Sequence, residues 1–350
     1  MPDCPASIPI DASVPCSDDG YPALWERGMT DIACADARAR PLVSVIMPCF
    51  NAAPYVNEAV SSVLGQTYGN VELVVVDDGS TDGSDTILTE LAGVHPDRIR
   101  FLHSNRLGPY PARNLALRQA DGELIAFLDA DDWWLPETLE KLHAALVEAD
   151  ADLAYCGWQN VGEGMESPPY VPPAYEEEDA VAHFLRSCPW PIHAALVKRP
   201  VVEQVGGFSE RRFASMDYDF WLRALAETRR IKRVPEVMAF YRWHQLGQVS
   251  AVKWRQVLDA LDAQQDFIRR NPGLVAHLPA EKLRDLTEGQ VLRQAYRAFW
   301  KRDLVSARKL FRHAAVKGTY RMGDLRHVLS AFLPMPVYRG LVKLTERKQA

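Results

Sequence analysis

Three aspartates that follow an apolar run are the side chains in this sequence best suited to chemistry. Asp129, Asp131 and Asp132 come directly after the apolar residues 124–128. Carboxylates this close repel one another unless solvent or a cation compensates their charge. Mg²⁺ and Mn²⁺ prefer oxygen ligands and often combine one or two carboxylates with substrate phosphates. The spacing therefore indicates a divalent-cation site, although an acidic surface turn before the helix at Pro136 would have the same sequence.

A second acidic cluster follows another apolar run. Residues 71–76 end in Asp77-Asp78-Gly79-Ser80. An aspartate here could accept a hydrogen bond from a nucleobase N–H, and the common alternative is an Asx turn. Arg106 and Arg113 lie in the sequence between the two clusters. Arg113 could contact a phosphate, or it could form a surface ion pair.

Strands and helices alternate four times between residues 42 and 146. The predicted strands cover residues 42–47, 71–76, 99–102 and 123–128, and each is followed by a segment of helical periodicity. This alternation predicts an α/β fold, with a mostly parallel sheet and helices on both faces. Ligands bind at the carboxyl ends of such strands, so the polar clusters should meet at one edge of the sheet.

The rest of the chain changes character along its length. The pattern indicates helices between 200 and 230 around Gly206-Gly207, one or two short strands between 232 and 241, and helices from residue 252 to the end. Residues 291–299 and 304–314 have the spacing of a helical hairpin. The expected divisions are a flexible extension at 1–40, a nucleotide-binding half at 41–155, an acceptor-binding half of the same domain at 156–250, and a helical region with a basic end at 251–350.

Charge and composition limit the partners. The net charge of -6 argues against a nucleic-acid partner. Residues 301–350, however, contain twelve Lys or Arg and three Asp or Glu, which fits contact with anionic lipid head groups or a solvated helical face. The apolar run 328–338 could lie in a membrane interface or pack on the preceding helices. No stretch reaches the roughly 18 apolar residues that span a bilayer. No secretory signal and no zinc spacing of cysteines is found, so a cytoplasmic location, at the inner face of the membrane if the basic end binds lipid, is expected.

Three motifs in fixed order resemble the family 2 glycosyltransferases of GT-A fold. Residues 43–51 (VSVIMPCFN), 75–80 (VVDDGS) and 127–132 (FLDADD) carry the resemblance, and residues 112–114 (ARN) and 122–123 (GE) match as well. It covers roughly residues 41–250. The resemblance implies a GT-A type nucleotide-binding sheet and a nucleotide-sugar donor, such as a UDP-, GDP- or dTDP-sugar.

The same resemblance implies roles for individual residues. Asp131 would coordinate Mn²⁺ or Mg²⁺ on the donor diphosphate, with Asp129 near the metal and the ribose. His244 could approach the metal or diphosphate. The nucleotide pocket would be formed by Pro48, Phe50, Asn51, Asp78, Arg113 and Asp129, with Phe50 stacked on the base. The loop Gly108-Pro109-Tyr110-Pro111 departs from the family pattern beside Arg113.

The acceptor side rests on the segment that follows Gly206-Gly207-Phe208. The family has a Glu-Asp pair there, and its Asp is the catalytic base. Met216 replaces the Glu in this chain, and Asp217 keeps the Asp. A helix start with acids in its first turn would give the same pattern. The acceptor side is expected to include Met216, Trp190 and Trp221, while Trp158 and His193 are further aromatic candidates.

The resulting expectation is a metal-dependent, inverting glycosyltransferase. It would move one sugar to the hydroxyl of a glycan or lipid-linked acceptor in cell-surface polysaccharide or glycolipid synthesis. Processive synthases carry a Gln-x-x-Arg-Trp motif and several membrane spans, and neither is present. Two alternatives stay open. One is a sugar nucleotidyltransferase, although residues 49–53 lack the glycine-rich phosphate loop. The other is a non-catalytic nucleotide-binding protein with a degenerate site, which the Met216 replacement would fit.

Overall fold

The computed structural model describes residues 40–162, 167–210, 214–243 and 253–346. The extension predicted at 1–40 therefore lies outside the described residues except for Arg40. His244 lies outside them too. No helix within the described ranges is both long enough and apolar enough to cross a bilayer.

The first half of the chain forms the predicted parallel sheet. Its strands are β1 (Val43–Cys49), β2 (Val71–Asp77), β3 (Ile99–His103) and β4 (Leu124–Phe127), and its crossover helices are α2 (Val56–Leu64), α3 (Ser84–Val94) and α4 (Pro109–Gln119). The strands are buried because helices cover the sheet, which explains their nearly continuous apolar sequences. The order is β3-β2-β1-β4, with every neighbouring pair parallel.

This order sets where a ligand can bind. The chain moves outward from β1 to β3 and then returns to place β4 on the other side of β1. Because parallel crossovers are right-handed, α2 and α3 lie on one face of the sheet and α4 on the other. The direction reverses between β1 and β4, and the crevice at such a switch point is where ligands bind in open α/β sheets.

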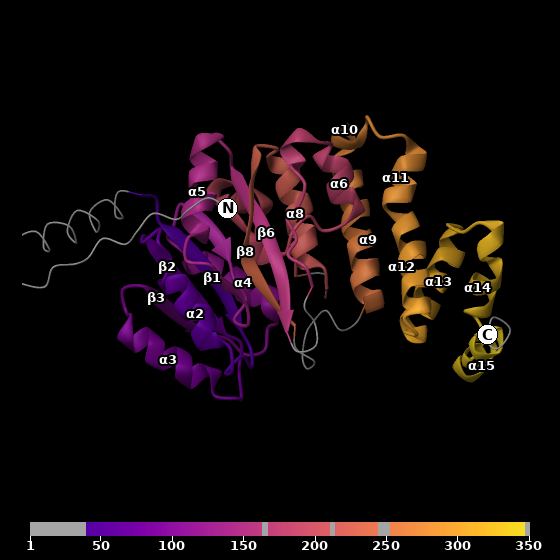
Figure 1. The fold of residues 1–350 in the computed structure, drawn as a ribbon, viewed down its shortest axis with the longest axis horizontal. Helices are drawn as coiled ribbons and strands as arrows, with labels where there is room; N and C mark the ends of the chain where they lie inside the picture. The colour runs from indigo at the N-terminus through magenta and orange to yellow at the C-terminus, as the bar shows by residue number, and fades with distance from the viewer. Residues whose placement is uncertain (1–39, 163–166, 211–213, 244–252, 347–350) are drawn as a thin grey trace, which may run out of the picture.

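The second half extends the same sheet with strands of mixed direction. They are β5 (Trp133–Trp134), β6 (Leu153–Gly162), β7 (Ala195–Lys198) and β8 (Ile231–Trp243), and they continue the sheet in the order β4-β7-β6-β8-β5. Here only β6 and β8 are parallel, while β7 is antiparallel to both of its neighbours and β5 is antiparallel to β8. The expected division at residue 155 falls inside β6, so both halves share one sheet (Figure 1).

Short helices connect these strands. They are α5 (Thr138–Glu148), η1 (Tyr175–Glu177), α6 (Ala180–Arg186), η2 (Ile192–Ala194), α7 (Arg199–Val205) and α8 (Met216–Glu227). The turn after α7 requires glycine, because Gly206 and Gly207 have φ values of 75° and 74°. A Cβ on Gly207 would also lie 2.7 Å from Oδ1 of Asn114. Asn114 in turn pairs with both backbone groups of Phe208 and fixes that ring beside α4.

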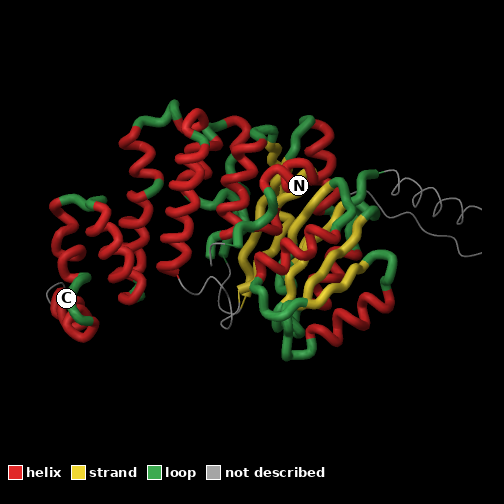
Figure 2. Tube along the Cα trace, turned by 180° about the vertical axis from the view of Figure 1, so that it is seen from behind, coloured by secondary structure: helices red, strands yellow, loops and turns green. Residues whose placement is uncertain are grey.

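The C-terminal region is helical, as predicted. It contains α9 (Lys253–Arg270), α10 (Pro272–Val275), α11 (Ala280–Leu286), α12 (Glu288–Trp300), α13 (Leu304–Lys317), η4 (Met322–Asp324), α14 (Leu325–Ser330) and α15 (Met335–Glu346). The predicted hairpin corresponds to α12 and α13. Figure 2 shows these helices stacked beside the sheet rather than over it. Ala263 and Phe267 of α9 belong to the main core, whereas Leu261 belongs to a second core with α12 to α15.

Candidate active site

A cavity of about 630 Å³ lies at the carboxyl ends of β1, β2 and β4. Residues after these three strands line one side of it, and residues from η2, α8, β8 and α9 line the other. The position matches the switch point of the sheet. The cavity walls include eight residues predicted from the sequence: Pro48, Phe50, Asn51, Asp78, Arg113, Asp129, Asp131 and Asp217.

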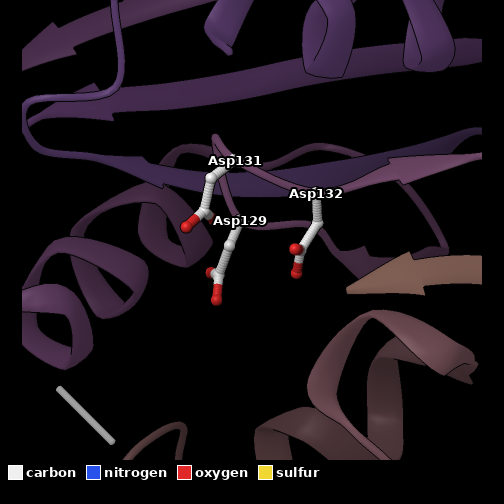
Figure 3. Close-up of side chains that lie close together, drawn as sticks. All are labelled: Asp129, Asp131 and Asp132. Atoms are coloured by element: carbon white, nitrogen blue, oxygen red, sulfur yellow. The ribbon is translucent and has the colours of Figure 1, made fainter. Parts of the chain in front are cut away.

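The acidic loop after β4 gathers its three carboxylates on one side. A ligand oxygen from each of Asp129, Asp131 and Asp132 can be chosen so that all three lie within 4.8 Å of one another. Figure 3 shows the three side chains leaving the same side of the loop. The donor set is entirely hard oxygen, which fits Mn²⁺ or Mg²⁺. Asp129 and Asp131 line the cavity, so they are the residues that could hold a cation there.

Asp132 has a different environment from its two neighbours. Its side chain is fully buried, and its Oδ2 lies 3.1 Å from Nδ1 of the equally buried His193. Its Oδ1 accepts a hydrogen bond of 2.8 Å from the backbone N–H of Arg242. Burial raises the pKa of Asp132 to about 7, against the opposing influence of His193. The Asp132 carboxylate thus holds the backbone of Arg242 through Oδ1 and faces His193 through Oδ2, away from the positions of Asp129 and Asp131 in the cavity lining.

Arg242 holds the same loop from the side of β8. Its Nε donates a hydrogen bond of 2.9 Å to the carbonyl oxygen of Asp131. Its guanidinium also pairs with Glu58 at 2.5 Å and lies 4.3 Å from the centre of the Trp133 ring. These contacts tie the acidic loop to α2 and to the edge of the sheet, and they fix the backbone from which Asp131 projects.

Arg113 of α4 joins the acidic loop to the opposite wall. Its side chain is 4 % exposed, and it pairs through Nη2 with Oδ1 of Asp129 and through Nη1, at 3.6 Å, with Oδ1 of Asp217. The guanidinium carbon lies 5.4 Å from the ring centres of both Tyr110 and Phe208. Burial alone would lower the pKa of Arg113, but the two carboxylates raise it above its ordinary value. Arg113 is thus a permanent cation between two acids.

The unusual proline-containing loop before Arg113 does not disturb this arrangement. Pro109 begins α4, where the missing N–H costs no hydrogen bond, and Gly108 supplies the positive φ of 92° that precedes it. Tyr110 then lies against Arg113. The departure from the family sequence at these positions is compatible with a regular helix.

Asp217 stands in the first turn of α8, two residues after Ser215, which has a positive φ of 58°. Its side chain is 32 % exposed at the cavity wall, yet Oδ1 is buried and forms no hydrogen bond to any described residue. Burial raises the pKa of Asp217 above its ordinary value, Arg113 opposes that shift, and Asp129 adds to it. A carboxylate with a raised pKa and a free face is suited to accept a proton.

Met216 occupies the place of the expected Glu but does not reach the cavity. Its side chain is 1 % exposed and belongs to the main core. The charged contact to Asp217 comes instead from Arg113 on a different helix. Trp190 and Trp221 are likewise 1 % and 0 % exposed and pack on each other at 5.5 Å. The structure therefore places these three acceptor-side candidates in the core and outside the cavity lining, and their role on the acceptor side stays a prediction.

Asp78 shapes the loop that opens α4. Its Oδ1 accepts hydrogen bonds of 2.7 Å from the Ser104 hydroxyl and the Leu107 N–H, and its Oδ2 accepts one of 2.7 Å from the Gly108 N–H. A carboxylate offers about four acceptor positions, so roughly one is left facing the cavity. The remaining acceptor position of Asp78 is the one that could accept a hydrogen bond from a nucleobase.

Phe50 and Asn51 form the outer rim of the cavity. Phe50 is 47 % exposed, and the guanidinium carbon of Arg106 lies 5.2 Å from its ring centre. Asn51 has a positive φ of 52°, and its Oδ1 accepts a hydrogen bond of 2.8 Å from Thr81. An exposed aromatic ring beside a cation offers a surface on which a nucleobase can stack.

Several lining residues carry no sequence signal of their own. They include Tyr55, Cys188, Ser215 and Gln256. His193 was one of several aromatic candidates by type, and the structure distinguishes it from Trp158, because His193 lines the cavity. Gln256 comes from α9, which links the C-terminal region to the cavity wall.

Comparison with known proteins gives a consistent family. Residues 44–206 match the family model described as Glycosyl transferase family 2. TuaG of Bacillus subtilis, described as a putative teichuronic acid biosynthesis glycosyltransferase, is 30 % identical over 221 residues, which cover 62 % of this chain and 84 % of the relative. An uncharacterized glycosyltransferase of Haemophilus influenzae is 40 % identical over 121 residues, covering 33 % of this chain and 48 % of the relative. Four other relatives are covered over only 31 % to 65 % of their length.

Solved structures share the fold at low sequence identity. Staphylococcus aureus TarS 1–349 in complex with UDP-GlcNAc aligns with a TM-score of 0.54 and 18 % identity, covering 79 % of this chain and 92 % of that one. The mannosyltransferase PcManGT from Pyrobaculum calidifontis, in complex with GDP-Man and Mn²⁺, aligns with a TM-score of 0.54 and 22 % identity, covering 91 % of both chains. The predicted GT-A type fold is therefore confirmed.

Proposed function

The chain belongs to glycosyltransferase family 2, and from this premise we propose that it transfers one sugar from a nucleotide-sugar donor to an acceptor hydroxyl. The observation that carries the proposal is the Asp129–Arg113–Asp217 chain of charges across one cavity. It joins a candidate metal loop to a candidate base within a single open cavity. A carboxylate with a raised pKa that faces a candidate metal loop across a cavity is more typical of a catalytic site than of a binding protein.

Donor binding is assigned to the wall formed by β1, β2 and β4. Phe50 stacks on the base, Asp78 accepts from the base edge with its remaining acceptor position, and Pro48 and Asn51 complete the pocket. Arg113 helps to hold the nucleotide and balances the charge of Asp129. The complexes of the fold neighbours with UDP-GlcNAc and GDP-Man support a nucleotide-sugar donor without choosing its base or sugar.

A divalent cation is assigned to Asp131 and Asp129. Three hard carboxylates within 4.8 Å and the Mn²⁺ bound to PcManGT support this assignment. Mn²⁺ or Mg²⁺ held there would neutralise the negative charge that develops on the departing diphosphate. The His244 contribution expected from the family stays a prediction.

The chemical step needs a single displacement. Asp217 accepts the proton of the acceptor hydroxyl while that oxygen forms a bond to the anomeric carbon. The bond from this carbon to the diphosphate oxygen breaks, and its electron pair leaves with the nucleoside diphosphate. One displacement inverts the configuration at the sugar. Arg113 keeps the proton-accepting carboxylate in place and limits the rise of its pKa.

The acceptor and its context are proposed in broad terms. A glycan or lipid-linked acceptor of cell-surface polysaccharide or glycolipid synthesis is supported by the name of TuaG alone. The cytoplasmic location likewise stays a prediction.

The test is release of nucleoside diphosphate from a panel of nucleotide sugars, with Mn²⁺, with Mg²⁺ and with EDTA. Release from one donor should require metal and fall by roughly 10²-fold or more in Asp131→Asn. Asp97→Asn, an exposed acid outside the cavity, is the matched control and should behave like the parent. Formation of pyrophosphate from nucleoside triphosphate and sugar phosphate would instead favour a nucleotidyltransferase. Tight nucleotide binding without release from any donor, even with candidate acceptors, would favour a non-catalytic protein.

A further inference from the structure

The last two helices expose apolar side chains that a solvated surface would not favour. Leu329, Phe332, Val337 and Leu341 are 64 %, 52 %, 49 % and 40 % exposed, and they are referred to together as the terminal apolar residues. Leu329 lies in the last turn of α14, and Phe332 lies two residues after the end of that helix. Val337 and Leu341 are four residues apart on α15 and therefore share one face of that helix.

The fold does not depend on these four side chains. Other residues of the same helices form the local core: Val328, Ala331, Tyr338 and Val342, all less than 9 % exposed. Exposed large apolar residues are also concentrated in this part of the molecule. Among the described residues there are fifteen, and nine of them lie at or after Trp300. Such a concentration is typical of a surface that meets an apolar partner.

The same region is strongly basic. Residues 301–350 carry twelve Lys or Arg and only three Asp or Glu. The guanidinium carbon of Arg312 lies 5.4 Å from the ring centre of the exposed Phe332. In the parts of the chain that the structure covers, no carboxylate forms an ion pair with Arg312, Arg326 or Arg339. Basic residues and exposed apolar side chains therefore occur in the same region, α13 to α15.

We propose that α14 and α15 dock on the surface of an anionic lipid bilayer. The terminal apolar residues would enter the boundary between head groups and acyl chains, while the nearby Arg side chains contact the phosphates. Each Lys or Arg close to an anionic surface contributes about 1 kcal/mol to binding. A few shallow apolar side chains and a basic fringe together give reversible attachment without a membrane span.

Charge favours a bilayer over a second copy of this chain. A symmetric dimer through the same face would bring each basic fringe against its own duplicate. The positive side chains of two copies would repel each other, whereas anionic lipid head groups would attract them.

The docking surface is also well separated from the proposed active site. Figure 1 shows α14 and α15 at the end of the helical region farthest from the sheet. Docking through them leaves the cavity at the sheet edge uncovered. The inference does not rest on the transfer reaction, and it holds or fails independently of that reaction.

Vesicle flotation of the full chain tests the proposal. The protein should float with vesicles of phosphatidylcholine and phosphatidylglycerol, stay behind with phosphatidylcholine alone, and dissociate from the anionic vesicles at 1 M salt. The double variant Leu329→Ser/Phe332→Ser should bind roughly tenfold less. In Arg326→Gln/Arg339→Gln, the affinity for anionic vesicles should fall roughly fivefold for each charge removed.

Matched variants separate docking from general effects. Val94→Ser/Val147→Ser removes two exposed apolar residues, 71 % and 66 % exposed, from α3 and α5 and should float like the parent. All variants should keep the parental melting temperature, since the altered side chains lie outside both cores. Equal flotation with neutral vesicles, no flotation at all, or a concentration-dependent dimer that the serine variant abolishes would overturn the proposal.

Discussion

Nη1 of Arg113 lies 3.6 Å from Oδ1 of Asp217, and the same guanidinium pairs with Asp129 on the acidic loop after β4. One buried cation therefore touches both the proposed base and the proposed metal site. A change in the charge of Asp129 should therefore alter the pKa of Asp217, because Arg113 contacts both carboxylates.

The pH dependence of catalysis should report the pKa of Asp217. This pKa is raised above its ordinary value, so kcat/KM should fall as the pH drops through a value higher than that of a solvated aspartate. In Arg113→Gln the opposing cation is gone, so the pKa of Asp217 should rise further and the acidic limb should move to higher pH. The measurement is the pH profile of kcat/KM for nucleoside diphosphate release. An unchanged acidic limb in a folded Arg113→Gln protein would show that another group is the base.

Asp217→Asn should remove most of the transfer activity and leave donor binding intact. The variant keeps the shape of the side chain but cannot accept the proton, so kcat should fall by roughly 10² to 10⁴-fold. Asp219→Asn is the matched control, since Asp219 lies in the same helical turn and pairs with Arg223 instead of facing the cavity. Nucleotide binding by calorimetry should be equal in the three proteins. Comparable losses of kcat in both variants would point to a disturbed helix rather than to a lost base.

His193→Leu should destabilise the fold by breaking a buried pair. Both His193 and Asp132 are at most 1 % exposed, so the remaining carboxyl would have no partner at its Oδ2. Removing one member of such a pair costs about 3 to 5 kcal/mol of unfolding free energy. Denaturant unfolding at constant pH measures the change, and the double variant His193→Leu/Asp132→Leu should recover part of it. A loss below about 1 kcal/mol in His193→Leu would mean that the pair is not a structural anchor.

The two glycines after α7 should differ in their tolerance of alanine. Gly206→Ala places a Cβ in open space. It should lower the free energy of unfolding by about 1 to 2 kcal/mol, because alanine is strained at a positive φ. Gly207→Ala carries the same φ cost and also sets a Cβ 2.7 Å from Asn114 Oδ1. It should therefore be the less stable of the two, and it should lower kcat because Asn114 fixes Phe208 beside Arg113. The melting temperature and kcat of both variants are to be compared. Equal values in the two variants would show that the position of Asn114 does not affect stability or catalysis.

The sequence predicts β1, β2 and β4 well because these strands are almost fully buried and their sequences are nearly continuous apolar runs, and the partly buried edge strand β3 is recognised from its place in the alternation of strands and helices. The segments that complete the sheet give weaker signals. β7 has only four residues between Pro191 and Pro200, and β5 has two. β6 begins apolar but continues through Gly157 and polar residues, with an irregular register to β8. Pairing with strands far away in the chain defines these elements, and local periodicity does not record that pairing.

Some features of the candidate site could likewise be predicted from the sequence, and others could not. Asp78, Asp129 and Asp131 follow predictable strands, so their convergence is expected from topology alone. The contact between Arg113 and Asp217 joins α4 to α8 across a hundred residues, and it depends on the glycine turn that seats Phe208. Met216 shows the limit of motif reasoning, because the charged contact of Asp217 is with Arg113 of another helix and the local sequence does not record it.

The placement of α9 bears on how this chain can be cut or recombined. Its Gln256 lines the cavity and its backbone oxygen accepts a hydrogen bond of 2.9 Å from Ser215, while Asp259 accepts one of 2.8 Å from the backbone of Ala214. These contacts brace the start of α8, where Asp217 projects. A chimera that exchanges the C-terminal helices for those of another family member should therefore join the two sequences after α9. A junction before α9 would separate the base from part of its own scaffold.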